Sequence, residues 1–160
     1  MDKPVCSSHI GKRPNHEDNF LIDGSYLSSD IQKRMSDKRC YFVNGASSSN
    51  IHLYAVSDGM GGHNAGEVAS RICVERLSLA YNELQQSRSL KEAVTYLQAI
   101  IAEINDTVCN MSRKQPELKG MGATLVLLIA YKDEYALLNI GDSRAYYFSD
   151  STITQITKDH

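Results

Sequence analysis

Three aspartates lie where the sequence predicts strand ends or tight turns. Asp58 follows the apolar run 51–57, and Asp18 comes shortly before the apolar run 20–22. Asp142 lies between two predicted strands. If a sheet brings these positions together, three carboxylates converge, and like charges at short range repel unless a cation lies between them. Oxygen ligands of this kind favour hard ions, Mg²⁺ or Mn²⁺, over zinc. Each aspartate could instead cap its own turn.

Two further residue types near these acids suit phosphate chemistry. Gly59 follows Asp58 and has no side chain, so its carbonyl oxygen could approach a metal ion closely. Arg13 lies five residues before Asp18, and a guanidinium beside a metal-bound acid cluster can hold two phosphate oxygens. On spacing alone, Arg13 could equally be a solvated surface residue beside Lys12.

The glycine-rich stretch 58–66 has a rival interpretation as a nucleotide loop. Gly59 and Gly61 fit the first two glycines of a dinucleotide fingerprint, but the third position is Asn64, and no Gly-Lys-Ser/Thr follows. His63 lies in this loop and could act as an acid near the site. It could also order the loop through a hydrogen bond.

Two helices and several strands must position these residues. Apolar residues recur at spacings of three and four over 69–84 and over 90–111, which predicts two amphipathic helices. Ser89 is the expected N-cap of the second helix, with Glu92 completing a capping box. The short connection 85–88 makes the helices antiparallel neighbours.

Strand patterns precede and follow the helix pair. They cover Val5–Ile10, Phe20–Ile22, Ile51–Ser57, Ala123–Tyr131, Glu134–Ile140, Ala145–Phe148 and Ile153–Thr157. Residues 23–50 are polar and rich in serine, and are expected to form a loop insertion with a small hairpin around 41–43. Separate runs of strands and helices predict an α+β fold with an antiparallel sheet.

Composition limits the class of protein. The chain has 160 residues, of which 42% are hydrophobic, and a formal charge of −2. This length suits one domain, 1–160. The charge argues against a nucleic-acid partner, and no apolar run reaches membrane-spanning length. Four widely spaced cysteines without a Cys-x-x-Cys pair and an N-terminus without a signal-peptide core indicate a protein of the reducing cytoplasm.

Taken together, five motifs resemble those of the metal-dependent protein Ser/Thr phosphatases of type 2C (the PPM family), in their bacterial form. They appear in the family's order over nearly the whole chain. The motifs are Gly11–Asn19, Val56–His63 with Gly66–Ser70, Gly120–Thr124, Asn139–Tyr146 and Gln155–His160.

The resemblance implies two packed antiparallel β-sheets flanked by helix pairs, in α-β-β-α layers, with a metal centre at one edge of this β-sandwich. Asp58 would bridge two Mg²⁺ or Mn²⁺ ions, and the Gly59 carbonyl would bind one of them. Glu17 and Asp18 would bind the other directly or through water. Asp142 would match the acid of a third, looser metal site.

The resemblance also implies an activity, which is hydrolysis of phosphoserine and phosphothreonine in proteins by a water that bridges the two ions. Arg13 would hold the substrate phosphate. Animal-type members have a histidine where this chain has Met60, so protonation of the leaving group falls to a candidate, His63. The partners would be phosphorylated proteins, the substrates of a Ser/Thr kinase.

The family domain is longer than this chain, which stops before the family's later aspartate motifs. We therefore expect a domain that is incomplete at its C-terminus, has exposed sheet edges, binds metal weakly and has little or no activity by itself. The alternative function is a non-catalytic module that recognises phosphoproteins or another partner. A nucleotide-binding protein is a third hypothesis.

Overall fold

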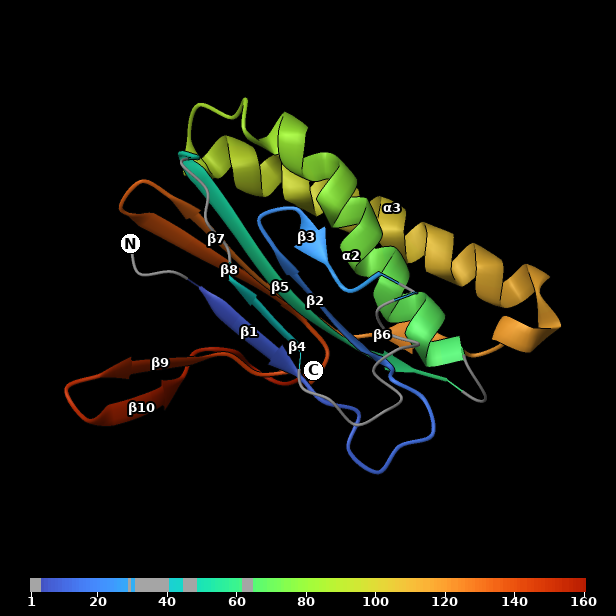
Figure 1. The fold of residues 1–160 in the computed structure, drawn as a ribbon. Helices are drawn as coiled ribbons and strands as arrows, with labels where there is room; N and C mark the ends of the chain where they lie inside the picture. The colour runs from blue at the N-terminus through green and yellow to red at the C-terminus, as the bar shows by residue number, and fades with distance from the viewer. Residues whose placement is uncertain (1–3, 29, 31–40, 45–48, 62–64) are drawn as a thin grey trace.

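A central antiparallel sheet with a pair of helices on one face forms most of the molecule (Figure 1). The computed structural model describes residues 4–28, 30, 41–44, 49–61 and 65–160. The strand order in the central sheet is β3-β2-β5-β7-β8, and β6 also pairs with β5. The strands are β2 (Asp18–Ile22), β3 (Ser25–Tyr26), β5 (Ile51–Met60), β6 (Gly122–Ala123), β7 (Leu125–Tyr131) and β8 (Glu134–Ile140).

The alternation of side chains along strand β5 places Asp58 on one particular face of the sheet. Alternate residues of a strand point to opposite faces. Ile51, Leu53 and Ala55 are buried toward the helices, whereas Val56 and Asp58 are exposed. Asp58 therefore lies on the outer face of the sheet, opposite the helix pair.

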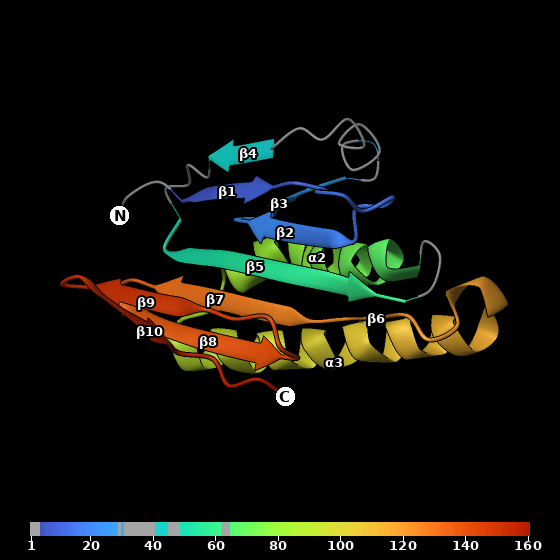
Figure 2. The ribbon, with the colours of Figure 1, turned by 90° about the horizontal axis from the view of Figure 1, so that it is seen from below.

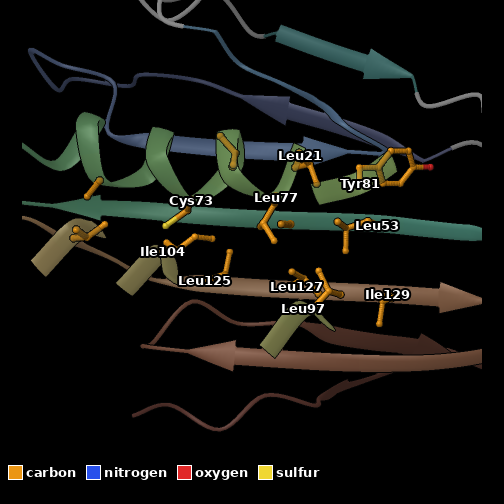
Figure 3. Packing of buried hydrophobic residues seen from close by; sticks show 14 of the residues in the cluster. Leu21, Leu53, Cys73, Leu77, Tyr81, Leu97, Ile104, Leu125, Leu127 and Ile129 are labelled. Atoms are coloured by element: carbon orange, nitrogen blue, oxygen red, sulfur yellow. The ribbon is translucent and has the colours of Figure 1, made fainter. Parts of the chain in front are cut away.

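The helices α2 (Ala65–Leu84) and α3 (Leu90–Lys114) cover the inner face. Their apolar stripes pack on the sheet, with Leu77 and Leu97 fully buried against β5 and β7 (Figure 3). Each such leucine contributes about 1.5–3 kcal/mol to folding. The predicted N-cap is confirmed, because Ser89 Oγ accepts a hydrogen bond from the Glu92 N–H at 3.2 Å. Glu92 Oε2 in turn accepts the N–H of Arg88 at 2.8 Å.

Two small sheets lie on the opposite side of the central sheet from the helices (Figures 1 and 2). One pairs β1 (Val5–Ser8) with β4 (Tyr41–Asn44), and the other pairs β9 (Tyr146–Ser149) with β10 (Thr152–Gln155). A 3₁₀ turn, η2 (Pro116–Leu118), follows α3. The α+β class with antiparallel sheets is confirmed.

Several predicted boundaries were wrong. The range 23–50, predicted as a loop insertion with a small hairpin around 41–43, contains the short strands β3 and β4, and residues 41–44 pair with β1. Strand β5 continues through Met60, so Asp58 lies inside the strand and not at its end. The pattern ended early because Gly59 and Met60 carry no strand signal of their own and are held by pairing with β6.

A cleft of about 560 Å³ opens between the outer sheet face and the small sheets. Cys6, Leu137, Ser143 and Asp58 are among its lining residues. Nearby apolar side chains are strongly exposed, among them Tyr147, Phe148 and Ile153 at 61%, 67% and 70%. Within the described residues, helices thus cover only the inner face of the sheet. None of the described helices combines the length and apolar character that a membrane span requires.

Candidate metal centre

Asp18 and Asp58 face each other across the ladder between β2 and β5. The two strands are antiparallel, with Asp18 opposite Asp58 and Phe20 opposite Val56. Side chains of directly opposite residues have Cβ atoms about 4.5–5.5 Å apart, and like charges in such pairs destabilise a sheet. The register thus brings together two acids that lie 40 residues apart in the sequence.

The pKa of Asp58 is raised by its partial burial and by the neighbouring acids. Although the side chain is exposed at the rim of the cleft, the surrounding protein removes enough water to raise its pKa above the ordinary value. The charge of Asp18 and a hydrogen bond between the two carboxyls raise this pKa further, followed by the charges of Asp142 and Glu17. All four predicted acids therefore lie close enough to interact.

Gly59 lies where three backbone segments meet. Its N–H donates to the Glu17 carbonyl oxygen at 3.1 Å. A Cβ atom on Gly59 would lie 2.0 Å from the carbonyl oxygen of Gly66, in the first turn of α2, and 2.8 Å from that of Glu17. A Cβ on Gly66 would lie 2.9 Å from Glu17 Oε1. The same Cβ would lie 2.8 Å from the Gly59 carbonyl oxygen, so only glycine fits at both positions, and the missing side chain at Gly66 leaves room for the Glu17 carboxylate.

Arg13 lies on the same small pocket as the acids. This pocket, of about 200 Å³, is lined by His9, Ile10, Arg13, Asn15, His16, Glu17, Asp18 and Asp58. The Arg13 side chain is 77% exposed, and its Nη1 lies 3.7 Å from Glu17 Oε2. The guanidinium is therefore at the solvent edge of the acid cluster, where it is paired with Glu17.

Asp142 lies in a turn after β8, and residues at the C-terminal end of the chain form hydrogen bonds with this turn. Arg144 donates to both carboxylate oxygens of Asp159, from Nε at 3.1 Å and from Nη2 at 2.6 Å. This pairing holds the pKa of Asp159 below its usual value. The N–H of His160 also donates to the Gly141 carbonyl oxygen at 3.2 Å. Both contacts fix the turn on either side of Asp142.

Sequence reasoning missed three residues of the site. Thr124 bonds to the backbone of Asp58, and Ser143 bonds to Thr124. His16 is 5% exposed, and its Nε2 is 2.9 Å from Ser8 Oγ. Its Nδ1 is buried without a partner among the described residues. All three residues lie within the motifs that carry the family resemblance, but no pattern in those motifs indicated these contacts.

The arrangement fits a hard divalent cation. Its donors are carboxylates that repel one another, three of them exposed and that of Glu17 half-buried, with no thiolate among them. In the described part of the chain, no three His, Cys, Asp or Glu side chains already surround one point closely enough to hold an ion. The acids thus form an open cluster. The predicted role of His63 lies outside the described residues.

Comparison with known proteins identifies the family. A family model described as protein phosphatase 2C matches residues 37–160. The chain belongs to the protein phosphatase 2C family. The serine/threonine phosphatase stp of Listeria welshimeri is 40% identical over 111 residues, which are 69% of this chain and 44% of that protein. The serine/threonine protein phosphatase PstP of Mycobacterium tuberculosis is 36% identical over 111 residues, or 69% of this chain and 21% of that protein.

The phosphatase 2C fold extends beyond the residues that the family model matches. The crystal structure of the catalytic domain of PstP in complex with two manganese ions matches 99% of this chain, with a TM-score of 0.71 and 29% identity. This match takes in the segment around Arg13 and Asp18. It covers 55% of that catalytic-domain chain. The present chain therefore spans less than half of the Listeria phosphatase, at 44%, and about a fifth of the whole PstP protein, at 21%.

Proposed function

We propose that this chain carries the N-terminal part of a Mn²⁺- or Mg²⁺-dependent protein Ser/Thr phosphatase domain. The observation that supports this best is the register of β2 and β5, which sets Asp18 opposite Asp58 beside Glu17 and Asp142. The manganese-bound relative supports the choice of ion. Local turn capping by each aspartate does not account for this convergence.

Each acid has a proposed place in the centre. Asp58 would bind two ions at once, and the Gly59 carbonyl one of them. Glu17 and Asp18 would bind the other, and Asp142 a third ion. When bound, such ions lower the pKa of water and neutralise charge on a phosphoryl group. Without them the mutual repulsion of the acids is uncompensated.

Arg13 would bind the phosphate of the substrate. Its guanidinium is exposed on the pocket that also contains Asp58, and an arginine can pair with two phosphate oxygens at once. Glu17, 3.7 Å away, limits where this flexible side chain can lie. His63 is proposed as the proton donor to the leaving group, or otherwise as a residue that orders its loop.

The proposed substrates are phosphorylated proteins, products of a Ser/Thr kinase in the cytoplasm. The open arrangement of the acids suggests weak metal binding and little activity in the chain alone. The same observation favours a second candidate function, a module that binds phosphoproteins without hydrolysing them.

The test is a Mn²⁺ titration of the purified chain beside two variants. Asp58→Asn removes the central acid, and Asp106→Asn removes an exposed acid on α3 as a matched control. We expect Mn²⁺ to raise the melting temperature of the original chain and of Asp106→Asn but not of Asp58→Asn. Slow Mn²⁺-dependent release of phosphate from a phosphothreonine peptide should follow the same order.

Other outcomes separate the two functions. Peptide binding without phosphate release would support the binding module. A chain that neither responds to Mn²⁺ nor binds the peptide would refute both functions.

A further inference from the structure

Thr124 holds both backbone groups of Asp58. Its N–H donates to the Asp58 carbonyl oxygen at 2.9 Å, and its Oγ1 accepts the Asp58 N–H at 3.0 Å. Its own carbonyl oxygen accepts the hydroxyl of the fully buried Ser57 at 2.8 Å. One residue thus sets the position of the backbone from which the Asp58 carboxylate extends.

This pattern departs from an ordinary sheet ladder. The registers Val56 with Val126 and Gly59 with Ala123 place Thr124 directly opposite Asp58. In a regular hydrogen-bonded antiparallel pair the two residues exchange two backbone bonds. Here the Thr124 carbonyl oxygen accepts a hydrogen bond from the Ser57 hydroxyl. The Asp58 N–H donates to the Thr124 hydroxyl instead of to that carbonyl oxygen.

The Thr124 side chain also contacts the turn that contains Asp142. Thr124 Oγ1 lies 2.6 Å from Ser143 Oγ. A hydroxyl can accept the Asp58 N–H and still share a proton with a second hydroxyl. On the other side of Asp142, Gly141 has φ +93°, and a Cβ there would lie 2.8 Å from Thr124 Cγ2. The hydroxyl and the methyl of Thr124 therefore contact the residues on both sides of Asp142.

We propose that Thr124, with Ser143, is a positioning residue that fixes Asp58 relative to Asp142 and so couples their binding of divalent cations. This inference rests on the proposed function, because it concerns the same metal centre. Thr124 itself contacts neither ion nor substrate. It acts through the two acids.

The variants separate the hydroxyl from the methyl. Thr124→Val keeps the shape but removes the hydroxyl, Thr124→Ser keeps the hydroxyl, and Ser143→Ala removes only its partner. Thr107→Val is the matched control, because Thr107 also loses a hydroxyl bond, to the Glu103 carbonyl oxygen at 2.8 Å on α3. Circular dichroism and the metal-free melting temperature show whether each variant folds, and Ser143→Ala provides the test if Thr124→Val does not.

Mn²⁺ affinity, measured by calorimetry, is the first readout. Substituting a residue that hydrogen-bonds and orients a metal ligand typically weakens metal binding by about 10- to 100-fold. We expect a loss of at least about tenfold in Thr124→Val, and near-original affinity in Thr124→Ser and Thr107→Val. Asp142→Asn should weaken binding less in the Ser143→Ala background than in the original chain. Original affinity in both Thr124→Val and Ser143→Ala would overturn the inference.

Hydrogen exchange of the Asp58 amide in the metal-free protein is the second readout. Thr124→Val should speed this exchange, and Thr107→Val should not. If the original chain does not bind Mn²⁺, the proposed function fails and the coupling of cations fails with it. The exchange result then still decides whether Thr124 holds Asp58, since unchanged exchange in Thr124→Val would refute that contact.

Discussion

At the scale of single residues, Asp58 lies in an unfavourable position for the metal-free protein. Desolvation and the charges of Asp18, Asp142 and Glu17 all oppose its ionised form. A group of this kind lowers the stability of the folded state whenever it is charged and uncompensated. The same repulsion is what a bound cation would relieve.

Asp58→Asn should therefore stabilise the metal-free chain at neutral pH. Removing one of two like charges that face each other across a ladder is worth about 1 kcal/mol or less. For a chain of this size that corresponds to a rise in melting temperature of at most about 2–4 °C. The measurement is thermal unfolding in a chelating buffer, with Asp106→Asn as the control. A lower melting temperature for Asp58→Asn at pH 7 would contradict this account.

The pH dependence of this difference has a definite sign. The pKa of Asp58 is raised in the folded state, so between the unfolded and folded pKa values the folded chain binds more protons. The stability that Asp58 contributes is fully present when the pH is below its pKa in the unfolded chain. This contribution is lost as the pH rises through its pKa in the folded chain. The advantage of Asp58→Asn should thus grow from about pH 4 toward neutrality and vanish in acid.

The identity of the acids could be predicted from the sequence, but the geometry around them could not. Asp18, Asp58 and Asp142 were expected to meet because each adjoined a predicted strand end or turn. Thr124 went unnoticed because its role depends on a side chain replacing one ladder bond, and local pattern does not reveal such a replacement. The burial of His16 could not be predicted, because nothing in its neighbourhood in sequence indicates it.

At the scale of elements, the helices were predictable and the strand boundaries were less so. The stripes that define α2 and α3 repeat over several turns, and Ser89 provides a local cap signal. Strand β4 lies where a small hairpin was predicted, but its partner, β1, was not identified because it lies far away in sequence. Strand β5 extends past Asp58 because its last residues fit against β6, the Glu17 backbone and α2.

The close approach of β5 to α2 at Gly59 predicts that Gly59→Ala and Gly120→Ala lower the free energy of unfolding by different amounts. Gly59→Ala would place a Cβ 2.0 Å from the Gly66 carbonyl oxygen, so α2 or β5 must move, at a cost of about 3 kcal/mol or more. Gly120→Ala is the control, because it has φ +77° but nothing within 4 Å of the added atom, and it should cost only about 1–2 kcal/mol. Urea unfolding measures both values, and equal losses would contradict the close approach.

At the scale of the whole molecule, the two faces of the central sheet differ. The inner face is closed by α2 and α3, and β9 and β10 lie on the outer side (Figure 2). Several apolar side chains of β9 and β10 are exposed to solvent. Contiguous exposed apolar surface promotes association. The helices on the inner face give the chain a core, while individual apolar side chains such as Phe148 and Ile153 stay exposed on the outer side.

Phe148→Lys and Ile153→Lys should therefore make the chain more soluble and less prone to associate. Both residues are at least two-thirds exposed, at 67% and 70%, and they are cross-strand partners in the β9–β10 pair. Leu79→Lys is the control, because Leu79 is 71% exposed but lies on α2. Sedimentation velocity over a range of concentrations should show reduced association in the first two variants only. Equal behaviour of all three would mean that the outer strands are not the associating surface.

The distance in sequence between the residues of the acid cluster has a consequence for folding kinetics. Asp58 and Thr124 are 66 residues apart in the sequence, and β7, which leads from Thr124, pairs with β5 across the whole helix pair. We therefore expect their bond to form only after α2, α3 and β7 have assembled around β5. Contacts of such long range form late, since their loop-closure entropy must be overcome first. A cation bound between strands that join late stabilises interactions absent from the transition state. Mn²⁺ should therefore slow the unfolding of this chain while leaving its folding rate nearly unchanged.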